Sequence, residues 1–218
     1  MPDDGRRYRS TLREEQAEQT RLRIAQAARV RFVEQGWAGT TMRSVAAAAG
    51  VSEATVYAVY GNKAGLAIAL VDGADRAADA PRMLTELQAH TGDPRAQLSV
   101  FVRFECRLFA EAGDALRVIV EGRRNDQALQ AAYEEGRGRG DRTRRAVFES
   151  WPPSALRAGV DVDRALDVFA VTVSIQTYDV AVRERGWSAE AVQQWWLELL
   201  SDLLLSGAAV TTSTRSPA

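Results

Sequence analysis

The chain of 218 residues contains only one cysteine, Cys106, and one histidine, His90. A single cysteine cannot form a disulfide within the chain and fits a reducing compartment, so we expect a cytoplasmic protein. His90 stands in a loop with Gly, Asp and Pro, without a nearby nucleophile or metal-ligand spacing. No glycine-rich phosphate-binding loop is present. These absences argue against an enzyme, a metal site and a bound cofactor.

Long apolar runs are also lacking. No stretch approaches the roughly 20 residues that cross a membrane, and residues 1–16 lack the apolar segment of a signal peptide. Hydrophobic residues make up 46% of the chain and charged residues 26%, which is typical of a globular protein. We therefore expect no membrane partner.

Lysine is nearly absent, because Lys63 is the only lysine among 28 basic residues. The net charge of −1 hides an asymmetry: residues 1–66 hold ten basic and seven acidic residues, and the remainder holds eighteen and twenty-two. The N-terminal part is thus the more basic one, and a polyanion would be met there.

Helical periodicity runs through the whole chain, and the fold class predicted is all-α. Residues 1–19 are polar and are expected to form a flexible arm, and residues 207–218 a disordered tail. A helix starts near Thr20 and ends near Gly36. Short helices and a long one follow to about residue 78. The helices expected further along the chain cover 94–112, 114–123, 126–149, 161–185 and 188–206.

Two short helices meet at a tight turn between Thr41 and Tyr60. Thr41 and Ser52 are suited to cap the first and second helix, since their hydroxyls accept from free backbone N–H groups. Gly50 adopts the left-handed conformation at the turn without a Cβ penalty. This arrangement is a helix-turn-helix, in which one helix enters the major groove of DNA and the other braces it.

The order of residues from Thr20 to Leu70 closely resembles the DNA-binding domain of the TetR family of transcriptional regulators. The resemblance rests on Phe32 with Gly36-Trp37, on Thr40-Thr41, and on Ala49 to Ser52. It continues through Thr55-Val56-Tyr57-Ala58-Val59-Tyr60 and Asn62-Lys63. It implies a helix-turn-helix domain at 20–66, followed by a helical ligand-binding and dimerisation domain at 67–206.

The resemblance also implies residue roles. Thr41, Tyr57 and Lys63 would contact phosphates, and Arg43 would reach a base or the backbone. Base edges would be read at the start of the recognition helix. The complete set expected to bind DNA is Thr40, Thr41, Arg43, Ser52, Glu53, Ala54, Thr55, Tyr57, Tyr60 and Lys63.

The recognition helix departs from the family pattern because it contains no cation. Glu53 either accepts from a cytosine amino group or only stabilises the positive end of its own helix. Ala54 and the Thr55 methyl can touch a thymine methyl. We expect the arginines of the arm, Arg6, Arg7, Arg9 and Arg13, together with Arg21 and Arg23, to add phosphate contacts.

The helix expected at 161–185 has two opposite apolar faces, whereas a helix on the outside of a monomer needs only one. It is either buried centrally or part of a homodimer interface, and the resemblance favours the homodimer. A two-fold dimer would bind two half-sites of an operator. The interface residues expected are Val171, Ile175, Tyr178, Val182, Trp196, Leu200 and Leu204.

Phenylalanines line the helix expected at 94–112, and Glu105 falls inside its apolar arc. A buried carboxylate needs a partner. Either Arg123 or Arg124 pairs with it, or Glu105 lines a ligand cavity together with Phe101, Phe104 and Phe109. Cys106 is expected to be a core residue, and the arginines between 137 and 145 a solvated face around Gly136, Gly138 and Gly140, where the helix is expected to kink or fray.

The sequence thus predicts a DNA-binding regulator, a repressor that a small-molecule effector releases from a near-palindromic operator. The alternative is a helical partner-binding module with weak or lost DNA binding.

Overall fold

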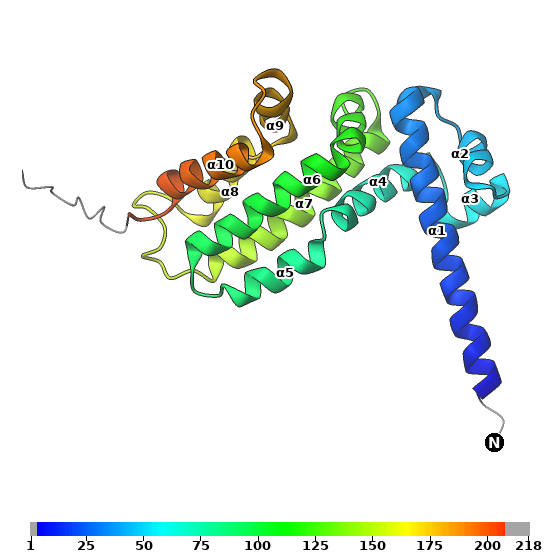
Figure 1. Cartoon of the computed structure of the whole chain (residues 1–218), viewed down its shortest axis with the longest axis horizontal. Helices are drawn as coiled ribbons and strands as arrows, with labels where there is room; N and C mark the ends of the chain where they lie inside the picture. The colour runs from blue at the N-terminus through cyan, green and yellow to red at the C-terminus, as the bar shows by residue number, and fades with distance from the viewer. Residues whose placement is uncertain (1–3, 208–218) are drawn as a thin grey trace, which may run out of the picture. The chain divides into compact units, whose positions relative to one another are not determined.

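The computed structural model describes residues 4–207, with side chains from Arg13 onward. Within this range the chain forms helices and no strand, apart from one isolated bridge between Leu156 and Leu205 (Figure 1). The prediction of an all-α fold is confirmed. The helices are α1 (Asp4–Gly39), α2 (Met42–Ala49), α3 (Glu53–Tyr60), α4 (Lys63–Ala77), α5 (Ala80–Ala89), α6 (Pro94–Gly122), α7 (Gln127–Glu149), α8 (Val162–Thr172), α9 (Ile175–Asp179), the π-helix η1 (Val180–Glu184) and α10 (Ala189–Leu204).

The chain divides into two compact units. The first comprises Met1–Ala78 and Glu111–Gly138, and the second comprises Asp79–Ala110 and Arg139–Ala218. Helices α6 and α7 therefore each contribute to both units. The domain boundary expected after residue 66 differs from this division, because all of α4 and a returning segment of α6 and α7 belong with the helix-turn-helix.

One core holds the first unit together. It joins Phe32 of α1, Val45 of α2 and Val56 of α3 to Leu66 of α4, all of them fully buried. The second segment of the unit completes this core with Ala115, Ile119, Leu129 and Ala132. The fully buried side chains from every helix explain why α1 to α4 pack as one body.

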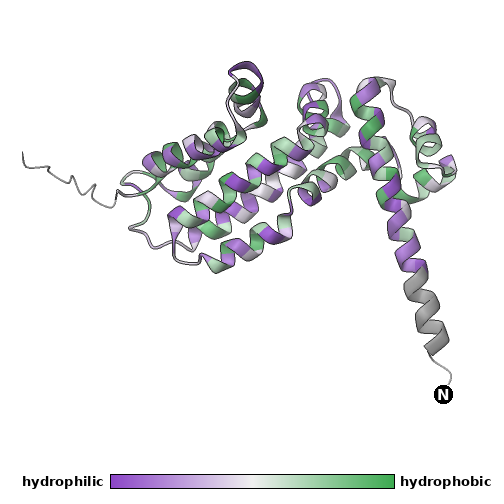
Figure 2. Ribbon diagram, viewed as in Figure 1, coloured by the Kyte–Doolittle hydropathy of each residue, from purple (hydrophilic) through white to green (hydrophobic). Residues whose placement is uncertain are grey.

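Helix α1 begins at Asp4, so the backbone of residues 4–19 is helical and not the flexible arm expected. The segment is rich in Glu, Gln and Arg, which are good helix formers. Between Arg13 and the first core residue, Ile24, hydrophilic residues predominate, drawn purple in Figure 2. The side chains of Arg6, Arg7 and Arg9 and the residues 208–218 of the expected tail lie outside the described residues.

The sequence predicts that glycines interrupt the helices of these two segments, but α6 and α7 are continuous. Helix α6 continues through Gly113, and α7 continues through Gly136, Gly138 and Gly140. Two of these glycines allow close contacts instead. A Cβ at Gly136 would lie 3.2 Å from Val71, and one at Gly140 would lie 2.5 Å from the guanidinium of Arg144.

The single helix expected at 161–185 is broken in two. Helix α8 ends at Thr172, Val173 is extended, and Ser174 starts α9 with a capping box to Thr177. The β-branched residues of the run Val171-Thr172-Val173 disfavour a helix, and the serine behind them offers a cap. The chain then passes into the π-helix η1.

Aromatic rings fill the core of the second unit. Phe101 packs edge-on against Phe148 and Phe169, and Phe109 packs against Tyr178 and Trp196. By length and composition, Val162–Glu184 could cross a membrane, which the sequence analysis had not recognised. Its break at Ser174 and the burial of Phe169 and Tyr178 fit a core segment better.

Candidate nucleic-acid interface

The turn between α2 and α3 has the geometry that the sequence indicates. The Thr41 hydroxyl accepts from the Ser44 amide at 3.1 Å, and the Ser44 hydroxyl accepts from the Thr41 amide at 3.0 Å. Gly50 ends α2 in the left-handed conformation, with φ 65° and ψ 38°. The Ser52 hydroxyl accepts from the Thr55 amide at 3.0 Å. Both helices are thus capped at the ends where free amides would meet phosphates.

Helix α3 buries one side and exposes the other. Val56 is fully buried, whereas Ala54 and Ala58 are exposed and Tyr57 is 47% exposed. Thr55 is half-buried, and its hydroxyl lies 2.8 Å from that of Ser52. The exposed side of α3 therefore presents methyl groups and one phenol, and no cation.

An ion pair connects the two helices of the motif. Nε of Arg43 on α2 lies 3.3 Å from Oε2 of Glu53 at the start of α3, and the Arg43 side chain is 86% exposed. The sequence suggests a base contact or a helix-end role for Glu53, and the ion pair with Arg43 is a third role. An exposed pair of this kind contributes about 0–1 kcal/mol, so Arg43 can leave it for another anion at little cost.

Thr40 is wrongly predicted as a DNA contact. Its side chain is 2% exposed, and its hydroxyl donates within 3.0 Å to the carbonyls of Arg31 and Gly36. These bonds join the end of α1 to the start of α2. Because the hydroxyl is buried and its proton is used, Thr40 has a structural role.

Tyr60 also differs from its expected role. Its hydroxyl donates to the carbonyl oxygen of Arg21 at 3.0 Å, and the Arg21 guanidinium lies 5.7 Å from the ring centre. Burial raises the pKa of the phenol, although nearby Arg21 and Arg76 oppose the shift. The side chain thus joins the end of α3 to α1, and its only proton is not available to a phosphate.

Lys63 lies against Trp37, with its ammonium 4.4 Å from the ring centre and hydrogen-bonded to the Trp37 carbonyl. The indole of Trp37 donates to Asp126 at 2.5 Å, and Asp126 caps α7. Burial lowers the pKa of Lys63. Burial raises the pKa of Asp126, but the bonds from Trp37 and from the backbone outweigh it and leave a lowered value.

This cluster of Lys63, Trp37 and Asp126 was not predicted from the sequence. Trp37 was recognised only as part of the family pattern, and the contact with Asp126 spans 89 residues. No short-range pattern reports such a contact. The lysine is half-buried, so the proposed phosphate contact would compete with its place on Trp37.

The candidate ligand residues of the second unit are buried core residues. Phe101, Phe104, Glu105 and Phe109 are each at most 9% exposed. Glu105 does not pair with Arg123 or Arg124, which belong to the first unit, but with Arg144 at 2.8 Å. Arg123 instead lies over the Tyr133 ring at 4.0 Å.

The expected dimer interface is largely wrong. Ile175, Tyr178, Trp196, Leu200 and Leu204 are buried within the single chain, so their side chains are not available to a second copy. Ile175 and Tyr178 follow the break at Ser174, which separates the two faces assumed for one continuous helix, whereas the other three are the buried side of α10. Val182 is half-buried, and Val171 is 78% exposed. The large apolar side chains that are exposed on α8 and α10 are Val171, Trp195 and Leu203.

The described chain thus contains a capped helix-turn-helix with an exposed recognition face, followed by a helical second unit with an aromatic core. Residues 24–70 match the family "Bacterial regulatory proteins, tetR family". No curated protein shows a significant sequence match to the chain.

Solved structures show a similar fold. A putative TetR-family regulator from Rhodococcus sp. is 18% identical, with 87% of this chain and 100% of that chain covered and a TM-score of 0.69. NalD from Pseudomonas aeruginosa, the secondary repressor of the MexAB-OprM multidrug efflux pump, is 20% identical, with 88% and 98% covered and a TM-score of 0.67. The regulator FadR from Bacillus subtilis, in complex with stearoyl-CoA, is 18% identical, with 83% and 97% covered and a TM-score of 0.66.

At these identities the likeness shows the fold. The fold and the site define a helical protein with a capped helix-turn-helix in its first unit. The chain carries the N-terminal domain of the TetR family within the fold of TetR-family regulators.

Proposed function

We propose that this protein is a DNA-binding transcriptional regulator, a repressor that a small molecule releases from a near-palindromic operator. The observation that carries the proposal is the exposed face of α3 in a motif whose two helices, α2 and α3, both have capped starts. Thr41 and Ser52 hold the free amides of α2 and α3 in position, which favours phosphates there. A regulator of this kind acts in the cytoplasm.

The exposed groups of α3 suggest how bases are read. Ala54 and the Thr55 methyl are suited to thymine methyl groups, and the Tyr57 hydroxyl to a phosphate. Arg43 leaves Glu53 when DNA arrives and takes a phosphate or a guanine. Glu53 is then free to accept from a cytosine amino group.

A homodimer is part of this proposal, because two half-sites lie roughly 34–36 Å apart on DNA. The dimer surface proposed now consists of the exposed apolar side chains of α8 and α10, namely Val171, Trp195 and Leu203. Exposed large apolar side chains such as Trp195 and Leu203 on α10 favour a partner that covers them.

The effector is proposed to bind in the second unit. Nε1 of Trp196 and Nε of Arg144 are among the polar atoms buried there without a hydrogen-bond partner in the described chain. Each unsatisfied donor costs about 1–3 kcal/mol, which a ligand with an acceptor group would recover. A ligand causes release only if it favours one of two conformations. Trp196 stands beside Phe109, one of the ligand residues predicted from the sequence.

The alternative is a helical partner-binding module with weak or lost DNA binding. The absence of a cation from α3 favours it, because phosphate contacts supply much of the affinity for DNA.

The test selects fragments of the source genome that the full-length protein binds at low salt. We expect an enriched, near-palindromic sequence, and we expect Tyr57→Phe to weaken its binding about fivefold to tenfold because one phosphate contact is lost. Leu84→Gln on α5 is the matched control. Failure to enrich any fragment would favour the partner-binding module.

A further inference from the structure

A hollow of about 310 Å³ lies in the first unit, between α1, α4 and α6. Its wall is made mainly of small side chains, contributed by all three helices: Ala25, Ala69, Gly73, Ala74, Ala77, Ala112 and Ala115. Alanines and a glycine facing one another leave space that larger side chains would fill. The volume is at the lower end of the range of small-molecule sites.

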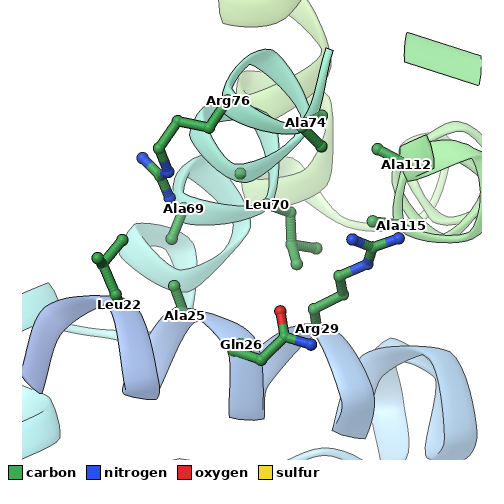
Figure 3. A pocket seen from close by; sticks show the side chains of 12 residues that line it. Leu22, Ala25, Gln26, Arg29, Ala69, Leu70, Ala74, Arg76, Ala112 and Ala115 are labelled. Carbon is green, nitrogen blue, oxygen red and sulfur yellow. The ribbon is translucent and has the colours of Figure 1, made fainter. Parts of the chain in front are cut away.

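Polar groups stand at only a few points around this hollow. Figure 3 shows Leu70 in its middle, Arg76 of α4 above Ala69 and Leu22, and Gln26 of α1 below. Arg29 of α1 reaches toward Ala112 and Ala115 in the same view.

The two arginines differ in their charge balance. Arg29 is bound to Asp114 at 2.7 Å and to the carbonyl of Glu111 at 2.6 Å, so its charge is largely compensated. Arg76 is exposed and forms no ion pair with the side chains of residues 13–207. The hollow therefore has an apolar floor, one uncompensated cation at its rim and one neutral amide.

We propose that this hollow binds a small anionic amphiphile, a carboxylic acid with a short apolar chain. The chain lies on Leu70 and the alanines, and the carboxylate is bound by Arg76 and the Gln26 amide. No aromatic side chain lines the hollow to stack a base, and Gln26 is the only neutral polar side chain in it, which excludes a sugar. A cation is disfavoured by the two arginines.

This site is separate from the effector site proposed in the second unit, and its occupant would contact both α1 and α4. These helices flank the helix-turn-helix in the chain and share its core. The binding itself needs no DNA, so its failure is distinguishable from failure of the proposed function.

The experiment titrates octanoate into the full-length protein, followed by calorimetry and by NMR of alanine methyl groups. We expect the methyl signals of Ala69, Ala74 and Ala112 to shift, whereas that of Ala165 in the second unit stays unchanged. Octanol, which has the same chain without the charge, is expected to bind at least tenfold more weakly, because a charge-assisted bond is lost.

Variants test the two parts of the site. Arg76→Gln is expected to weaken octanoate about tenfold, and Arg124→Gln, at an exposed arginine of the same unit that does not line the hollow, leaves it unchanged. Gly73→Leu is expected to block octanoate and octanol alike, since a Cβ at residue 73 has ordinary space, with its nearest neighbour at 3.9 Å. The circular-dichroism melting curve of each variant verifies folding.

Four results would overturn the proposal. These are no octanoate binding at millimolar concentration, equal affinity for octanoate and octanol, undiminished binding to the folded Arg76→Gln variant, or shifts confined to alanines of the second unit.

Discussion

Arg144 is a buried charge surrounded by two acids, an aromatic ring and a glycine. Its guanidinium bonds to Glu105 at 2.8 Å and to Asp141 at 3.0 Å, and it lies 4.7 Å from the centre of the Phe169 ring. Only 5% of the side chain is exposed. The sequence pattern predicts a solvated face for this arginine, and its burial corrects that prediction.

Removing Arg144 tests this role. Arg144→Leu is expected to lower the free energy of unfolding by about 3–5 kcal/mol, because Glu105 is left buried without its main counter-charge. Arg142→Leu, at an exposed residue of the same helix, serves as the control and is expected to change stability by less than about 1 kcal/mol. Urea unfolding of both variants measures the difference. Equal stability would contradict the structural role of Arg144.

Cys106 is a second buried group, and its burial predicts a thiol of low reactivity. Burial raises the pKa of its thiol to about 12, and the charges of Glu105 and Glu190 add to the shift. Since the thiolate is the reactive species, we expect Ellman's reagent to react far more slowly with the native protein at pH 8 than with the protein in urea. The unfolded chain loses this proton near pH 9 and the native chain does not, so the native state also loses stability as the pH rises above 9. Equally fast labelling of both states would contradict the burial.

At this scale the sequence predicted local roles well and burial poorly. Thr41, Gly50 and Ser52 followed from rules that act over three or four residues, and their geometry agrees. Thr40 and Tyr60 were assigned to DNA although their hydroxyls donate to backbone carbonyls. Which side of a short helix faces inward depends on α1, which no local pattern reports.

At the scale of elements, the broken segment at 162–184 is the clearest difference. Hydrophobic periodicity alone predicted one helix, because the apolar residues continue across the break. The capping pair Ser174 and Thr177 was present in the sequence but was not weighed against that periodicity. Ile175 and Tyr178 were wrongly assigned to the dimer interface for this reason, since the face expected for them requires an unbroken helix.

Two glycines in helices offer a matched pair of substitutions. Gly73→Ala in α4 adds a methyl into ordinary space and is expected to stabilise the protein by about 0.5–1 kcal/mol. Gly140→Ala in α7 places its methyl 2.5 Å from the Arg144 guanidinium, which must then move away from Glu105 and Asp141. We expect it to destabilise the protein. Thermal unfolding of both variants compares the signs, and a gain of stability from both would contradict the close approach.

At the scale of the whole molecule, the helix-turn-helix is completed by distant segments of the chain. Ala115, Ile119 and Leu129 join its core, and the cluster of Lys63, Trp37 and Asp126 connects it to the start of α7. The family resemblance indicated the fold from residues 20–70, but it could not indicate that residues 111–138 belong to the same unit.

The exposed apolar side chains of α8 and α10 lead to a prediction about the oligomeric state of the whole molecule. The double variant Val171→Glu and Leu203→Glu is expected to turn a dimer into a monomer, because it places charges on the proposed dimer surface. Leu84→Glu, at a leucine of similar exposure on α5, is expected to remain dimeric. Sedimentation velocity measures both. A monomeric wild type, or a double variant that stays dimeric, would contradict the surface.

Binding of the selected genomic fragment to wild type and to Ala54→Glu, followed by fluorescence anisotropy at several salt concentrations, tests the central claim most directly. Ala54 is exposed at the start of α3, so a larger side chain there can extend into solvent. The account predicts that the charge abolishes sequence-specific binding while the melting temperature is unchanged. Undiminished specific binding by the folded Ala54→Glu variant would contradict the assignment of α3 as the helix that reads DNA.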